Sequence, residues 1–513
     1  MAGLVGNPKM NRNARWLLAA FYLLLSLGGL TMVYPFWLML TGSVSGTFDF
    51  KDRTLIPRYL HDRNELFQKF LVQRYNDFKS LRTIYDVQDA LRPSDLRGRI
   101  LAPAPNQAPP PTLIADWRQF LQSAADPAWL TVADKERTTF LYREWLEARF
   151  SGPAPPEGDD PQWATQSPIE RMNRRYRLME PTFAFISLPE WKPGQDAQGP
   201  IHADYLDFLK SLPPGSLMVM DPISATAAGA GDSGSIRRGW ADFLRAKYGT
   251  DSALAAAWQT PGTSLDTVDV PWRAEDAFEF IGSETALRWR MATENYRWVL
   301  KFLFQRGRAF QNTLILVVTS IVVALLLNPL AAYAISRYPG RQSRVAMLLM
   351  ILTIAFPAEV AMIPSFLLLR DFHLLNTFAA LILPGAVSGF SVFLLKGFFD
   401  GLPEELFESA TLDGAGEMQV FWSIVLPLSR PILAVIALGT FTAAYGGYMW
   451  ALLVCQDPEM WTLMVWLFQF QINHAQMPWL GMAAFAVASI PTLLVFLFCQ
   501  RLILRGIIIP TEK

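Results

Sequence analysis

Cysteine is nearly absent from this sequence: Cys455 and Cys499 are the only two among 513 residues. Neither lies in the polar region between residues 46 and 300, so that region is not a scaffold held together by disulfide bonds. Histidine is also scarce, and the four residues are His61, His202, His373 and His474. They have none of the short spacings that are typical of metal ligands, so no metal site is expected.

An excess of charge of either sign is missing as well. Lys and Arg number 45, Asp and Glu also number 45, and no basic stripe occurs, which argues against a nucleic-acid partner. The sequence also lacks the Gly-x-x-x-x-Gly-Lys-Ser/Thr loop that binds nucleotide phosphates. We therefore expect no catalytic residue, no cofactor bound by this chain, and no enzyme activity of its own.

Long apolar runs are what the sequence has in abundance, and hydrophobic residues make up 51% of it. A run of about 18 or more apolar residues is typical of a transmembrane helix. Six spans are predicted, at residues 16–42, 312–336, 345–369, 376–398, 431–454 and 481–504. The first is too long for a signal-peptide core and precedes no clear cleavage site, so we expect it to be retained. The predicted fold class is an all-α polytopic membrane protein.

Basic residues indicate the orientation. They cluster before the first span, between the second and third, and at the C-terminus: Lys9, Arg12 and Arg15; Arg337, Arg341 and Arg344; Arg501, Arg505 and Lys513. With six spans all three clusters share one side, which the positive-inside rule makes cytoplasmic. The predicted domains are a cytoplasmic N-terminus with the first span (1–45), an extracytoplasmic insert (46–290), and a core (291–513) containing spans two to six and a cytoplasmic loop (400–430).

The loop at 400–430 carries the most specific pattern in the chain. Its spacing is Glu408-x-Ala410, three residues, Gly414, nine residues, Ile424, one residue, and Leu426-Pro427. This pattern resembles the coupling loop of permease subunits of binding-protein-dependent ABC importers. The resemblance implies that Glu408 and Gly414 lie at the interface with an ATPase. The implied coupling residues are Glu408, Ala410, Asp413, Gly414, Ile424, Leu426 and Pro427.

The resemblance extends through Ala331-Ala-Tyr-Ala-Ile-Ser-Arg337 and Phe393-Leu-Leu-Lys-Gly-Phe-Phe399, and is greatest to carbohydrate permeases of the maltose-transporter type. It implies import of a carbohydrate across a bacterial inner membrane by alternating access. The implied partners are a cytoplasmic ATPase dimer that binds ATP and magnesium, a second permease subunit, an extracytoplasmic solute-binding protein and membrane lipid. Sugar systems favour a heterodimer of two different permeases.

The fifth span departs from the family pattern, because Tyr445-Gly-Gly-Tyr448 replaces a Trp-Asn-Glu-Phe-like stretch. Its glycines permit close helix packing or an unwound segment along a path, and its aromatic residues suit either sugar stacking or lipid contact. The candidate residues for a translocation path are Phe441, Tyr445, Gly446, Gly447, Tyr448 and Trp450. The sequence after Arg505 also lacks the small-residue tail that reaches the ATPase in the maltose system.

The insert at 46–290 is the largest departure from the family pattern. Its length suffices for one or two compact domains, and the proline-rich stretches Ala102–Pro111 and Ser151–Pro161 predict linkers between helical pieces. One pattern occurs twice at the same spacing and, more weakly, a third time: Phe70-Leu71, Arg74-Tyr75, Leu81 and Tyr85; Phe243-Leu244, Lys247-Tyr248, Leu254 and Trp258; Trp145-Leu146 and Arg149-Phe150. We expect a mainly helical module.

The second occurrence is similar to a helical stretch of retaining β-galactosidase-type glycosidases. It leaves open a membrane-anchored carbohydrate-binding or glycoside-processing protein as the alternative. A retaining glycosidase needs two carboxylates about 5 Å apart, for which Glu190 and Asp221 are weak candidates. A secondary transporter would need ionisable residues inside its spans, and these spans are almost free of them. The importer interpretation is therefore preferred.

Overall fold

The described residues are mostly helical, and the chain divides into two compact units. The computed structural model describes residues 12–52, 54–75, 77–125, 130–152, 165–180, 183, 186–189, 199–213, 215–219, 236–305 and 308–505. One unit, here called the membrane unit, comprises Met1–Val44 and Thr293–Lys513, and the other, here called the insert, comprises Ser45–Ala292. Lys9, Glu190, Asp221, Lys513 and the C-terminal residues after Arg505 lie outside the described residues.

Three helices of the membrane unit are long and apolar enough to cross a bilayer. They are Trp16–Ser43 within α1 (Arg12–Ser43), α12 (Ala309–Arg337), and Pro478–Gln500 within α23 (Pro478–Arg505). Three further spans arise only as pairs of helices that meet at a bend. If each bent pair is one span, the described residues hold six, so the polytopic all-α class is confirmed.

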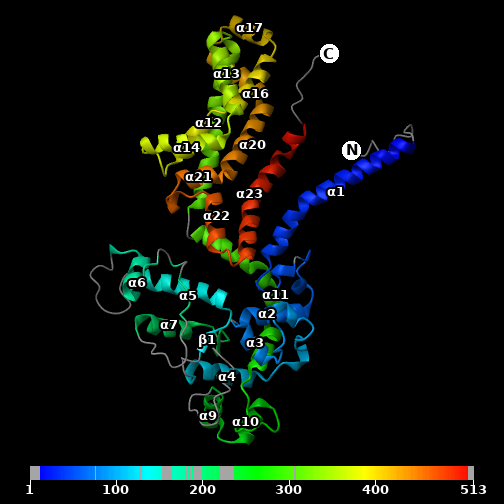
Figure 1. The fold of residues 1–513 in the computed structure, drawn as a ribbon, viewed down its shortest axis with the longest axis vertical. Helices are drawn as coiled ribbons and strands as arrows, with labels where there is room; N and C mark the ends of the chain where they lie inside the picture. Colours follow the sequence, from blue (N-terminus) through cyan, green and yellow to red (C-terminus); the bar gives the residue numbers. More distant parts are fainter. Residues whose placement is uncertain are drawn as a thin grey trace. The chain divides into compact units, whose positions relative to one another are not determined.

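The helices of the bent pairs and of the segments between them are shorter. They are α13 (Arg341–Ala355), α14 (Ala358–Asp371), α15 (Phe378–Ile382), α16 (Gly389–Asp400), α17 (Glu405–Leu412), α18 (Glu417–Val420), α19 (Leu426–Leu428), α20 (Arg430–Gly446), α21 (Tyr448–Val454) and α22 (Leu463–Asn473). Of these, α16 and α20 both pack along α12 (Figure 1). No residue in the most apolar window of α1 is buried, as expected for a helix that faces lipid or another subunit.

The bends correct the prediction of continuous spans. The span predicted at 345–369 breaks at Pro357, which lacks a backbone N–H, and the span at 376–398 bends by 47° between α15 and α16. The span predicted at 431–454 is wrong as one helix, because α20 ends at Gly446. A Cβ atom on Gly447 would lie 2.7 Å from the Ala443 carbonyl oxygen, so the backbone approaches too closely for a larger residue.

Gly389→Ala is expected to loosen the contact between α13 and α16. A Cβ at Gly389 would overlap the main-chain carbonyl of Met350 and lie 2.7 Å from the Thr353 hydroxyl oxygen. Overpacking of this kind costs about 1–3 kcal/mol, so the melting temperature of the detergent-solubilised chain should fall by about 2–10 °C. Gly397→Ala on the same helix meets nothing within 4 Å and is the control. Equal melting temperatures for both variants would contradict the expected clash.

The points where the insert leaves and rejoins the membrane unit are close together. Ser43 ends α1, while Asn295 and Tyr296 lie on the part of α11 (Trp272–Gln305) that belongs to the membrane unit. The Asn295 side-chain amide donates to the Ser43 carbonyl at 2.7 Å, and the hydroxyl oxygens of Ser43 and Tyr296 are 2.5 Å apart. The membrane unit therefore holds both ends of the insertion together by itself.

The insert contains short helices around one two-stranded sheet. Its helices are α2 (Arg63–Arg74), α3 (Phe78–Ile84), α4 (Pro111–Ser123), α5 (Lys135–Phe150), α6 (Pro168–Tyr176), α7 (Pro200–Ser211), α9 (Ile236–Tyr248), α10 (Asp251–Trp258) and the first part of α11. Strands β1 (Leu130–Val132) and β2 (Leu217–Val219) pair in antiparallel fashion. Within the described residues no alternation of strands and helices suggests the barrel of a glycosidase.

Two hydrophobic cores fill the insert. One consists chiefly of side chains from α2, α3 and the first part of α11, and the other of side chains from α4 to α7, α9 and α10. Strand β2 contributes to both cores, because Leu217 and Val219 point to one and Met218 to the other, as the alternation of side chains along a strand requires.

Candidate functional site

The loop at 400–430 forms a short surface helix closed by a glycine turn. The helix is α17 (Glu405–Leu412), with Glu405 and Glu408 in its first turn, where the helix dipole favours acids. Gly414 follows with φ +80°, a left-handed conformation that costs most other residues about 1–2 kcal/mol. The Ala415 N–H donates to the Ala410 carbonyl at 2.9 Å, which completes the turn.

The inner face of α17 is packed against the ends of two membrane helices. Phe407 and Ala410 are 5% and 7% exposed, and they share a hydrophobic cluster with Tyr333 of α12 and Phe399 of α16. The Arg337 guanidinium carbon lies 4.1 Å from the centre of the Phe407 ring, a cation–π contact that adds attraction to this packing. Displacement of α17 must therefore act directly on α12 and α16.

Two hydrogen bonds fix the segments on either side of α17 to the end of α12. The Tyr333 hydroxyl donates to Glu417 at 2.6 Å, and the Ser336 hydroxyl donates to Asp400 at 2.6 Å. Sequence reasoning did not find these contacts. The available signal was the polar face formed by Tyr333 and Arg337, four residues apart at the end of an otherwise apolar helix.

The outer face of α17 and the turn after it combine acidic and apolar side chains. Glu408, Asp413 and Gly414 are exposed, Leu412 is 89% exposed and Met418 is 61% exposed. Large apolar side chains that lie uncovered beside carboxylates are typical of a surface that another protein covers. Of the residues predicted for coupling, Glu408 thus lies on the side of α17 opposite its packed face, and Asp413 and Gly414 lie exposed in the turn after it.

The second half of the predicted coupling pattern lies just before α20. Ile424 belongs to a short π-helical stretch, Phe421–Val425, and Leu426 and Pro427 belong to α19. Ile424 and Leu426 are half-buried and Pro427 is exposed. The chain then bends by 80° into α20, where the Ser429 hydroxyl donates to the Val425 carbonyl at 2.6 Å. Of the seven predicted residues, only Ala410 is buried.

The residues predicted for a translocation path are not gathered on one surface. Tyr445 is buried, stacks on Phe441 with ring centres 5.5 Å apart, and donates its hydroxyl to the Ala488 carbonyl at 2.5 Å. The Trp450 indole donates to the Ala380 carbonyl at 3.1 Å. Gly446, Gly447 and Tyr448 are exposed at the break after α20. The polar atoms of Tyr445 and Trp450 thus serve helix packing.

Known proteins resemble this chain in the part that contains the loop. Residues 324–509 match the sequence profile of the family described as "Binding-protein-dependent transport system inner membrane component". The polygalacturonan/rhamnogalacturonan transport system permease protein YtcP of Bacillus subtilis is 33% identical over 233 residues, which are 42% of this chain and 80% of that protein.

Other relatives transport different solutes. The sn-glycerol-3-phosphate transport system permease protein UgpE of Yersinia pestis is 33% identical over 39% of this chain and 73% of its own length. The diacetylchitobiose uptake system permease protein NgcG of Streptomyces coelicolor is 32% identical over 38% and 66%. A crystal structure of a bacterial ABC transporter involved in the import of alginate contains a chain that is 27% identical, with coverage of 40% and 78% and a TM-score of 0.36.

Proposed function

This chain belongs to the family of binding-protein-dependent transport system inner membrane components, and from that premise we propose that it is one permease subunit of an ATP-driven importer of saccharides. It is a multi-pass inner-membrane protein and a component of a transporter rather than an enzyme. Among the relatives, the permease proteins for polygalacturonan/rhamnogalacturonan and diacetylchitobiose act in saccharide transport by their descriptions. A further relative is described as a permease protein for sn-glycerol-3-phosphate, which extends the range of solutes to a phosphorylated polyol.

The observation that carries the proposal is the two-sided construction of α17. Its outer face presents Glu408, Leu412 and the Gly414 turn to a partner, while Phe407 on its inner face packs against α12 and α16. An ATPase dimer that closes on ATP and magnesium would push on the outer face. Because the inner face is packed, the push would tilt α12 and α16 and convert the membrane unit between inward- and outward-open states.

The same contacts support the proposed orientation. Arg337 belongs to a basic cluster that the positive-inside rule assigns to the cytoplasm, and its guanidinium lies on Phe407 of α17. The cluster and the loop therefore share one membrane surface. With six spans, the insert lies on the opposite, extracytoplasmic side, where a solute-binding protein would deliver its cargo, and both termini are cytoplasmic.

A second permease subunit completes the proposed pathway. Large apolar side chains are exposed along α1, α13 and α14, among them Trp16, Phe36, Leu352 and Ile363. In a bilayer such surfaces contact lipid or another helix bundle. Saccharide importers of this family favour a different permease as the second subunit, so we propose a heterodimer.

Pull-down of the tagged chain from its native host in mild detergent tests the proposal. The double variant Glu408→Lys/Gly414→Asp is expected to retain at most a tenth of the ATPase that co-purifies with the unaltered chain, because it reverses one charge and adds a carboxylate on the outer face. Aspartate tolerates a positive φ better than most residues, so the turn is retained.

Asp371→Lys is the matched control, since it reverses an exposed acid at the end of α14, outside the loop. ATPase recovery should match that of the unaltered chain. Recovery of no ATPase with any of the three proteins, while the membrane unit remains folded, would overturn the proposal. Equal recovery of the ATPase with all three proteins would contradict the proposed coupling role of α17.

A further inference from the structure

The repeated pattern of the insert lies on three helices followed by three shorter ones. The first helices, here called donor helices, are α2, α5 and α9, and the shorter ones are α3, α6 and α10. Each donor helix carries a buried leucine three residues before a basic residue: Leu71 and Arg74, Leu146 and Arg149, Leu244 and Lys247. Each short helix presents an aromatic donor at or just after its end, and these residues are Tyr85, Tyr176 and Trp258.

Three other helices, here called acceptor helices, share a second pattern that the sequence alone did not single out. In α4, α7 and α11 a buried aspartate is followed four residues later by a buried phenylalanine. The pairs are Asp116 and Phe120, Asp204 and Phe208, and Asp276 and Phe280. Each aspartate is at most 3% exposed, so its charge must be compensated within the fold.

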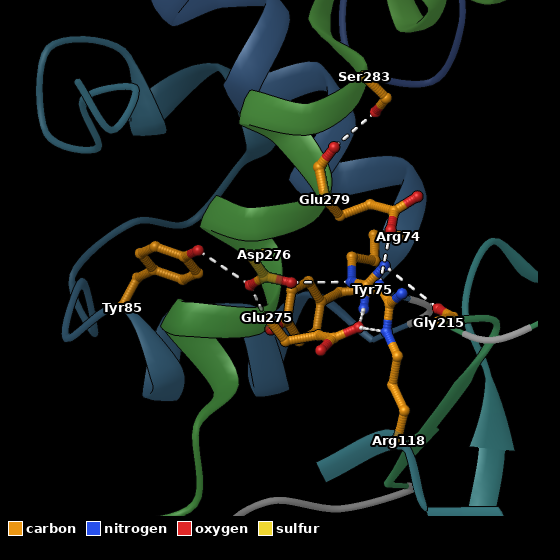
Figure 2. Close-up of polar contacts among 9 residues, drawn as sticks. All are labelled: Arg74, Tyr75, Tyr85, Arg118, Gly215, Glu275, Asp276, Glu279 and Ser283. Carbon is orange, nitrogen blue, oxygen red and sulfur yellow. Dashed lines mark hydrogen bonds and ion pairs between the residues drawn. The ribbon is translucent and has the colours of Figure 1, made fainter. Parts of the chain in front are cut away.

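The first donor pair, α2–α3, compensates Asp276 of α11 (Figure 2). Arg74 Nε lies 2.8 Å from Asp276 Oδ1. The hydroxyls of Tyr75 and Tyr85 both donate to Asp276 Oδ2, at 2.7 and 2.9 Å. Three side chains thus contact one carboxylate. They are the basic residue Arg74, the adjacent Tyr75, and Tyr85, which lies eleven residues after Arg74.

The third donor pair, α9–α10, makes the same set of contacts with Asp116 of α4. Lys247 Nζ lies 2.8 Å from Asp116 Oδ1. The Tyr248 hydroxyl and the Trp258 indole donate to Asp116 Oδ2 at 2.7 and 2.8 Å. Residue for residue, this arrangement repeats that around Asp276.

The second donor pair, α5–α6, closes on Asp204 of α7. Arg149 Nη2 donates to Asp204 Oδ1 at 2.6 Å, and the Tyr176 hydroxyl donates to Asp204 Oδ2 at 2.7 Å. Phe150, which occupies the position of Tyr75 and Tyr248, has no hydroxyl. Arg175 instead supplies a third donor to Asp204 Oδ2, at 3.1 Å.

Aromatic packing follows the same three pairings. Each acceptor phenylalanine contacts two aromatic rings, three residues apart, on its donor helix. Phe280 lies 4.8 and 6.0 Å from Phe67 and Phe70; Phe208 lies 5.0 and 5.9 Å from Tyr142 and Trp145; Phe120 lies 5.5 and 5.7 Å from Trp240 and Phe243. A chance resemblance would not reproduce both the polar and the aromatic contacts three times.

We infer that the insert consists of three copies of one helical unit, α2–α3–α4, α5–α6–α7 and α9–α10–α11, in which the first and third copies have exchanged their acceptor helices. In the middle copy, α5 and α6 make these contacts with the acceptor helix of the same copy, α7. The exchange locks the first third of the insert to the last third, because neither can compensate its buried aspartate without the other.

The aromatic donors keep their protons at all physiological pH values. Burial, with the facing carboxylates, raises the pKa of Tyr75, Tyr85 and Tyr176 above the ordinary value of 10 and that of Tyr248 to about 12. Each phenol therefore remains a hydrogen-bond donor to its aspartate. The three sets of contacts around Asp116, Asp204 and Asp276 are here called clasps. Near neutral pH the tyrosines do not titrate, so they make no clasp dependent on pH.

Hydrogen exchange of the full-length chain, followed by mass spectrometry, tests the exchange of acceptors. Asp276→Asn should remove the carboxylate that lies 2.8 Å from the buried Arg74 and speed exchange at least tenfold in residues 63–85 and 272–285. Asp116→Asn should do the same in residues 111–123 and 236–258. Asp204→Asn should affect only residues 135–150, 168–176 and 200–211.

Pairing within each copy predicts the opposite: Asp116→Asn would then destabilise residues 63–85, and that result would overturn the inference. Asp242→Asn is the control, because Asp242 is an exposed acid on a donor helix and pairs with Arg245 on the surface. If Asp276→Asn cannot be isolated, Tyr75→Phe serves in its place, since the middle copy already has Phe150 there. Faster exchange in residues 272–285 supports the lock, and unchanged exchange there overturns it.

Discussion

Phe407→Ala is expected to disrupt the packing of α17 against α12 and α16 and to abolish the recovery of an ATPase. The ring is 5% exposed and packs with side chains of α12, α16 and the 417–428 segment. Its truncation should cost about 3–5 kcal/mol, because the lost contacts leave a cavity. The melting temperature of the solubilised chain should fall by about 6–20 °C, and co-purified ATPase should fall at least tenfold.

The control is Phe407→Leu, which keeps most of the volume and should cost less than about 1.5 kcal/mol. It should retain most of the bound ATPase. The comparison with Glu408→Lys/Gly414→Asp is also informative, since that variant alters only the outer face and should lose the ATPase with little change in melting temperature. An Ala variant that melts like the unaltered chain and retains its ATPase would show that Phe407 does not hold the loop.

Excision of residues 45–292 is expected to leave a membrane unit that still assembles with the ATPase. The ends of the insertion are already joined, because Asn295 donates to the Ser43 carbonyl and Tyr296 contacts the Ser43 hydroxyl. A linker of about four Gly and Ser residues is long enough for so short a gap. In addition, 42% of this chain accounts for 80% of the YtcP protein, so this relative is a much shorter chain.

Recovery of the ATPase with the excised chain should lie within about twofold of the full-length value. Introduction of Glu408→Lys/Gly414→Asp into the excised chain should remove the ATPase again, which excludes non-specific retention. Aggregation of the excised chain in the membrane fraction, or loss of the ATPase from an otherwise monodisperse chain, would show that the insert is part of the core fold.

Hydropathy predicted six candidate spans, the number that the described residues can form, but not where their helices break. The breaks at Pro357, Ser388 and Gly447 each lie within a mainly apolar run, so a sum over a window of residues does not register the interruption. At Gly447 the break follows from backbone geometry, namely the approach to the Ala443 carbonyl. Composition marked this site only by the adjacent Gly446 and Gly447, which left close helix packing and an unwound segment both open.

The loop at 400–430 could be singled out from spacing because its residues are close in sequence. The contacts that hold it could not, since Tyr333 and Glu417 are 84 residues apart. The insert shows the same limit. The donor pattern was visible twice because both occurrences have the same spacing, whereas the acceptors Asp116, Asp204 and Asp276 lie in three separate helices far from their donors. An aspartate in a helix is too common to indicate its distant partner.

The exchanged clasps also set an order of assembly. Tyr75 and Asp276 are 201 residues apart, whereas Arg149 and Asp204 are 55 apart, so closing the longer loop costs about 1 kcal/mol more chain entropy. During synthesis, α5–α7 can fold before α11, the last helix of the insert, has been made. The contacts of α2–α3 with Asp276 cannot form until α11 is present. The leading segment, with its aromatic surface uncovered, is therefore the stretch that a chaperone or protease would meet first.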